Sequence, residues 1–133
     1  MKALAATAHG VVEVDVDEEL VLGLDEAAEL PQKALPAISL PLLVAADAVG
    51  ARVVAVVDRR PPLAVSDDAG MTWRETGGGL PPGRAVAINP DDPDLVIYAA
   101  RNRLYLSRDG GRFWAALAPE LPEIAAVTWS DQV

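Results

Sequence analysis

The side chains that could do chemistry in this sequence are arginines, acidic residues, two tyrosines and one histidine. Asp91, Asp92 and Asp94 supply the clustered oxygens that calcium prefers, but their spacing is not that of a calcium loop and is typical of a solvated turn. Residues 77–79 are three glycines without the Gly-Lys-Ser/Thr that completes a phosphate-binding loop. We therefore expect no metal site and no cofactor.

Composition narrows the class of protein. The chain has 133 residues, no cysteine and a formal net charge of −9. Without thiols it can form no disulfide and no thiolate metal site. The acidic balance disfavours binding to nucleic acid or to anionic membranes, and no run approaches the roughly 20 apolar residues of a membrane span. We expect a single-domain cytoplasmic protein.

The sequence contains an internal repeat. Residues 63–73 and 104–114 each read as an apolar strand, then Ser-x-Asp-x-Gly, then a tryptophan three residues after the glycine. The two tryptophans are 41 residues apart, and four-stranded β-propeller blades repeat at roughly 40–50 residues. The repeated positions are Ser66, Asp68, Gly70, Thr72 and Trp73 in one unit and Ser107, Asp109, Gly111 and Trp114 in the next.

Apolar runs separated by turn formers predict an all-β fold, with four short antiparallel strands in each unit. The expected units, or blades, span about 1–36, 37–79 and 80–123, and residues 124–129 form a closing strand. The N-terminal unit lacks the Ser-x-Asp-x-Gly pattern. Strands are expected near 2–8, 11–15, 20–24, 42–46, 52–57, 63–66, 73–76, 84–88, 95–100, 104–107, 113–117 and 124–129.

Residues 66–73 and 107–114 resemble the Asp-box of the BNR, or sialidase-like, β-propeller family. Phe113 departs from the family pattern, which usually has threonine there. The repeats also resemble photosystem II assembly factors of the same repeat class. The resemblance implies a β-propeller whose Asp-boxes lie in the peripheral hairpin between the third and fourth strands of a blade.

The physical chemistry of the motif is structural. A short aspartate accepts hydrogen bonds from the N–H groups of its own turn, glycine tolerates positive φ where the hairpin bends, and tryptophan anchors the turn by apolar burial. We interpret Asp68 and Asp109 as parts of a turn, and Trp73 and Trp114 as structural anchors. The alternative, that the aspartates bind metal or act as acids, is the weaker one.

One cluster of charge suggests binding. In a four-stranded blade, the connections between the second and third strands and between successive blades lie on the same face of the propeller. This places six candidate ligand-binding residues together: His9, Arg59, Arg60, Arg84, Arg101 and Arg103. Arginine forks suit carboxylates and phosphates, and the sialidase resemblance implies arginines that hold a substrate carboxylate on that face. The alternative is that these arginines solvate turns or pair with nearby acids.

Two functions follow as hypotheses. The first is a non-catalytic binding or scaffold module that recognises an anionic small molecule or a glycan. The second is a sialidase-like glycoside hydrolase, for which Tyr98 and Tyr105 are the candidate nucleophiles. Both tyrosines fall within predicted strands, and no carboxylate is clearly paired with either, so we expect no catalytic residue. An assembly-factor role is a third possibility.

The expected assembly is a homodimer. Three blades are too few to close a ring, because propellers have roughly four to eight. Sheet faces in an arc of three blades would then stay in water, and they are apolar here: Val53, Val54, Val56 and Val57 run without polar alternation, as do Leu95, Val96 and Ile97. Two copies give six blades, so we expect a six-bladed dimer whose junctions are closed by strand exchange. In that dimer, residues 124–129 of one chain pair with residues 2–8 of the other. A separate partner protein is the alternative.

Overall fold

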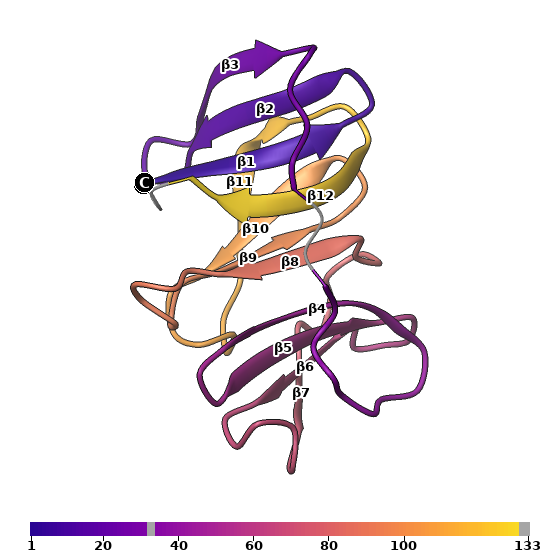
Figure 1. Cartoon of the computed structure of the whole chain (residues 1–133). Coiled ribbons are helices and arrows are strands. Elements are labelled where there is room, and N and C mark those ends of the chain that lie inside the picture. Colours follow the sequence, from indigo (N-terminus) through magenta and orange to yellow (C-terminus); the bar gives the residue numbers. More distant parts are fainter. Residues whose placement is uncertain (32–33, 131–133) are drawn as a thin grey trace.

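The computed structural model describes residues 1–31 and 34–130, which form twelve strands in three four-stranded antiparallel sheets and no helix (Figure 1). The all-β prediction is confirmed. In sheet order, the first sheet contains β12 (Ile124–Trp129), β1 (Lys2–Thr7), β2 (Gly10–Asp15) and β3 (Leu20–Asp25). The second contains β4 (Leu43–Val49), β5 (Arg52–Val57), β6 (Leu63–Ser66) and β7 (Arg74–Thr76). The third contains β8 (Ala85–Ile88), β9 (Val96–Ala99), β10 (Arg103–Ser107) and β11 (Ala115–Glu120).

All twelve predicted strands are present, and their boundaries differ by a few residues where turn bonds or strand pairing extend further than expected. β11 begins at Ala115 rather than at residue 113, because the carboxylate of Asp109 accepts the N–H of Phe113 and keeps that residue in the turn. β4 runs from Leu43 to Val49, three residues past its predicted end, because its pairing with β5 continues as far as Val49 and Arg52.

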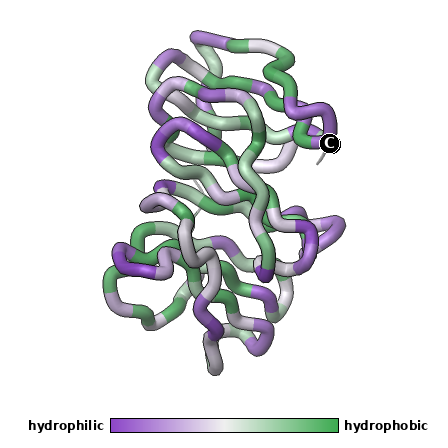
Figure 2. Tube along the Cα trace, turned by 180° about the vertical axis from the view of Figure 1, so that it is seen from behind, coloured by the Kyte–Doolittle hydropathy of each residue, from purple (hydrophilic) through white to green (hydrophobic). Residues whose placement is uncertain are grey.

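The sheets follow one another in space in the order second, third, first. Their inner strands β4, β8 and β12 are neighbours, with β8 in contact with both of the others. The arrangement is consistent with part of a propeller. Figure 2 shows hydrophobic residues along the strands of the stack and hydrophilic residues at many of its turns.

The two inner strands of the third sheet, β8 and β9, are buried on both faces. Ile97 and Ala99 of β9 belong to the core that this sheet shares with the first sheet, and Val96 and Tyr98 belong to the core that it shares with the second. All four side chains are fully buried. The uninterrupted apolar sequence of β9 is thus explained by cover on both sides, as the sequence predicts for such strands.

The closing strand β12 lies beside β1, in the predicted position, with Leu4 opposite Thr128 and Ala5 opposite Val127. In this structure it pairs with β1 of the same chain, and the exchange of this strand between two chains stays a prediction. The path from β11 to β12 is short. Its connection is held by hydrogen bonds from the N–H of Ile124 to the Arg101 carbonyl and from the N–H of Leu121 to that of Asn102. It delivers the strand directly to the neighbouring sheet.

The outer face of the second sheet is also covered. Val53, Ala55 and Val57 alternate with the core residues of β5 and point away from the third sheet, yet their exposures are only 4%, 0% and 2%. The expectation that this valine-rich face is left in water is therefore wrong. The segment before β4 approaches this sheet, since the Leu42 carbonyl accepts the N–H of Asp58.

Ile38 in this segment has a counterpart in the repeat. A Cβ atom on Gly111 would contact the Trp114 ring and Val65 of the neighbouring sheet. A Cβ atom on Gly70 would contact the Trp73 ring and Ile38, at 3.5 and 3.7 Å. Ile38 therefore stands beside Gly70 and Trp73 of the second sheet as Val65 stands beside Gly111 and Trp114 of the third.

We expect Ile38→Ala to lower the free energy of unfolding by about 1–2 kcal/mol, because a half-buried isoleucine loses part of its apolar contact. Leu35→Ala is the matched control, since Leu35 is 57% exposed in the same segment, and it should cost less than ~0.5 kcal/mol. Urea unfolding followed by tryptophan fluorescence measures both. Equal losses in the two variants would show that the segment does not cover the sheet.

Candidate functional site

The two Ser-x-Asp-x-Gly turns have the same geometry. The buried hydroxyl of Ser66 donates to Asp68 at 2.7 Å and accepts the N–H of Gly70 at 2.8 Å. Ser107 makes the corresponding bonds, to Asp109 and from Gly111, both at 2.8 Å. Both glycines have φ of +91°, a conformation that L side chains rarely adopt. Both aspartates thus take part in hydrogen bonds within their own turns.

The hydroxyl bond that Asp68 receives from Thr72 has no counterpart at Asp109, where the corresponding residue is Phe113. Asp68 accepts the N–H and the hydroxyl of Thr72, and these bonds, the hydroxyl first, lower its pKa from 3.8 to about 2. Asp109 accepts the N–H of Phe113, which lowers its pKa as well. Because the folded pKa of each is below the unfolded value, the stability these bonds contribute is present above about pH 4 and is lost as the pH falls through the folded pKa.

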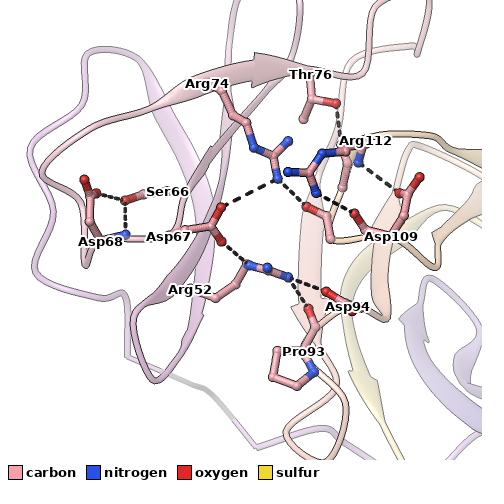
Figure 3. A network of polar contacts seen from close by, with 12 residues as sticks. Arg52, Ser66, Asp67, Asp68, Arg74, Thr76, Pro93, Asp94, Asp109 and Arg112 are labelled. Atoms are coloured by element: carbon pink, nitrogen blue, oxygen red, sulfur yellow. Dashed lines mark hydrogen bonds and ion pairs between the residues drawn. The ribbon is translucent and has the colours of Figure 1, made fainter.

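Arginines join the second sheet to the turns of the third (Figure 3). Arg52, at the start of β5, pairs with Asp67 and Asp94 and donates to the Pro93 carbonyl at 2.7 Å. Arg74 donates to the Gly110 carbonyl at 2.7 Å. Sequence reasoning missed this network. A signal for it was present in the sequence, because Arg52 and Asp94 occupy corresponding places in the repeat and have opposite charges, as an ion pair between neighbouring units requires.

The first sheet is joined to the third by acidic residues of its β2–β3 turn. Asp17 pairs with Arg108 at 3.3 Å and with the N-terminal amine at 2.8 Å. A carboxylate oxygen of Glu19 accepts the N–H of Ala118 in β11 at 2.7 Å. These contacts explain how the N-terminal unit packs although it lacks the Ser-x-Asp-x-Gly turn.

Two of the predicted ligand-binding arginines lie together. Arg84 and Arg101 both reach Oε1 of Glu123, at 2.9 and 3.9 Å. The adjoining β1–β2 turn is connected to the same place, because the N–H of Ala8 bonds the Glu123 carbonyl at 2.9 Å. That turn also carries the exposed His9. Two guanidinium groups share one carboxylate here, so the cluster of Arg84, Arg101 and Glu123 has a net charge of +1.

The other predicted arginines have different surroundings. Arg59 pairs with Glu75 at 3.7 Å, and Arg60 is exposed in the same β5–β6 connection. Arg103 pairs with Glu120 at 3.1 Å. The structure thus brings Arg84, Arg101 and the turn of His9 together, and it ties Arg59 and Arg103 to acids of their own sheets.

The candidate nucleophile Tyr98 is a core residue. It is fully buried, its hydroxyl donates to the Pro81 carbonyl, and its ring lies 5.9 Å from that of Trp114. Burial raises its pKa. Tyr105 is half-buried, with its ring 6.0 Å from that of Tyr98. A phenol that is buried and held in its protonated form is poorly suited to nucleophilic attack.

Within residues 1–31 and 34–130, no group of three or more histidine, aspartate or glutamate side chains could hold a metal ion. The same residues form no helix long and apolar enough to cross a membrane. No protein-family model matches the chain, and no curated protein matches it.

The two turns permit a reciprocal test. Thr72→Val should raise the pKa of Asp68 from about 2 toward 3.8, because it removes the hydroxyl that bonds the carboxylate. Phe113→Thr should lower the pKa of Asp109, because it supplies the hydroxyl that this turn lacks. Carboxyl ¹³C chemical shifts measured against pH report both values. Thr72→Ser is the control that keeps the low pKa, and an unchanged Asp68 in Thr72→Val would contradict the account.

Proposed function

We propose that the protein is a non-catalytic binding or scaffold module that takes an anionic ligand at Arg84 and Arg101. The ligand class is a carboxylate, sulfate or phosphate, or a glycan that carries one of these groups. The observation that carries this proposal is the sharing of Glu123 by two guanidinium groups. One positive charge is left over, at the surface of a chain whose net charge is −9.

Arg101 is the residue best placed to meet a ligand. Its side chain is 76% exposed, and its Nε lies 3.9 Å from Oε1 of Glu123. The guanidinium of Arg84 lies closer to the same oxygen, at 2.9 Å, and is therefore held more firmly. A planar guanidinium can donate two parallel hydrogen bonds to a carboxylate or phosphate. Arg84 then serves as the fixed partner, and Arg101 as the arm that closes on the ligand.

The scaffold in this proposal is a three-bladed part of a propeller whose hairpins are of the Asp-box type. The paired turn geometries at Ser66 and Ser107 support that assignment. Propellers commonly present one face to a ligand, and the fold alone does not set the function. The sialidase-like alternative is weaker because Tyr98 is buried in the core.

The six-bladed homodimer stays a prediction. With β12 paired within its own chain, as in this structure, two copies would close a ring by packing the first sheet of one against the second sheet of the other. The segment around Ile38 now occupies that face of the second sheet. Light scattering at micromolar concentration decides the question, since a mass near 14.0 kDa refutes the dimer and about twice that mass supports it.

Titration with acetate, sulfate, phosphate and sialic acid, followed by amide NMR shifts, should move the residues around Arg84 and Arg101 first. Arg101→Gln should weaken the binding about tenfold, because a charge-assisted pair of hydrogen bonds is lost. Arg112→Gln, in the turn at the opposite end of β10, is the matched control and should bind normally. Equal affinity of the two variants, or turnover of a fluorogenic sialoside, would overturn the proposal.

A further inference from the structure

The outer edges of the second and third sheets are blunted. β7 has only three residues, and its Arg74 and Thr76 side chains bond carbonyl groups of the third sheet. β11 contains Pro119, and the N–H of Ala118 is taken by Glu19. Short strands, proline and side chains that occupy backbone groups are the devices by which natural edge strands avoid pairing with other chains.

The outer edge of the first sheet, β3, lacks most of these devices. It has six residues, contains no proline or lysine, and all six residues are exposed. Leu20, Val21, Leu22 and Leu24 are 46–55% exposed. One irregularity does work against pairing with other chains: the β2–β3 register shifts between Glu13 and Val14, so Leu22 of β3 has no directly opposed residue on β2. A strand edge with so much exposed apolar surface marks an interface.

Acidic residues lie at both ends of this edge. Glu18 and Glu19 precede β3, Asp25 is its last residue, and Glu26 and Glu29 follow it. Asp17, before them, is already paired with Arg108 and the N-terminal amine. Residues 3–31 contain eight acidic residues and no lysine or arginine, so this stretch holds −8 of the net charge of −9. The edge is therefore apolar in the middle and negative at both ends.

We propose that β3 is a docking edge for an extended segment of another protein, apolar at its centre and carrying lysine or arginine at both ends. The segment would add a strand to the first sheet. Main-chain hydrogen bonds would give affinity, and the side-chain pattern would give specificity. A second copy of this chain does not fit, because two β3 strands paired antiparallel would set the acidic ends of one against those of the other.

A groove next to β3 supports an interface at this place. It has a volume of about 340 Å³ and lies between the β2–β3 turn and the β10–β11 hairpin, lined by Val16, Asp17, Phe113 and Leu117 among others. Phe113 is 79% exposed and stands where the other turn has Thr72, which bonds Asp68. An exposed phenylalanine in place of a bonded threonine gives this groove an apolar contact that the second sheet does not have.

The test uses a fluorescent peptide of about ten residues, with alternating valine and threonine at the centre and two lysines at each end. Fluorescence anisotropy should show binding that weakens with added salt, and a peptide with glutamates in place of the lysines should not bind. Leu22→Lys and the double variant Glu18→Lys/Glu26→Lys should each weaken binding by about tenfold or more.

Leu35→Lys is the matched control, since it changes an apolar residue of similar exposure outside β3, and it should bind the peptide normally. Circular dichroism shows that the variants are folded. Equal binding of the two peptides, binding that Leu22→Lys leaves unchanged, or dimerisation of the protein through β3 would overturn the proposal. The arginine cluster lies elsewhere on the chain, so Arg101→Gln should not affect this binding.

Discussion

Burial of β8 and β9, the inner strands of the third sheet, on both faces is the constraint on which the rest of the structure depends. β9 has no solvated side, because Val96 and Tyr98 face one neighbouring sheet and Ile97 and Ala99 face the other. A sheet of this composition is stable only between two others. The first and second sheets are therefore needed as cover, and their positions place Arg84 and Arg101 beside the β1–β2 turn.

Ionic and polar contacts at the periphery fix how the sheets sit on this core. At one junction Arg52 and Arg74 reach the turns of the third sheet, and a Cβ atom on Gly110 would lie 2.8 Å from the Arg52 guanidinium. At the other junction Asp17 and Glu19 reach Arg108 and β11. Contacts of this kind contribute little each when exposed, so their main effect is to set geometry while the apolar cores supply stability.

The sequence allowed the strands and the turn chemistry to be predicted, because both depend on local features. Alternation of apolar runs with turn formers locates the strands, and the spacing of Ser66, Asp68 and Gly70 specifies the hairpin whatever lies around it. The grouping of Arg84 with Arg101 followed from the order of strands within a repeat.

What the sequence did not reveal depends on tertiary packing. Val53 and Val57 are buried, and the segment that approaches their sheet before β4 has no repeat pattern. The pairing of Arg59 with Glu75 and of Arg103 with Glu120 depends on which side chains face each other across a sheet. Strand periodicity does not determine whether β12 pairs with β1 of its own chain or of another chain, because the β1–β12 register would be the same in either case.

The central claim is that β12 completes the first sheet within one chain, which gives each chain three full sheets. Leu4 and Thr128 are direct partners across β1 and β12, and opposed Cα atoms in antiparallel strands are close enough for a disulfide. The chain has no cysteine of its own, so the double variant Leu4→Cys/Thr128→Cys reports this pairing alone. After oxidation at micromolar concentration, a denaturing non-reducing gel should show a single species of one chain's mass. A covalent dimer from the double variant, absent from both single-cysteine variants, would contradict the account.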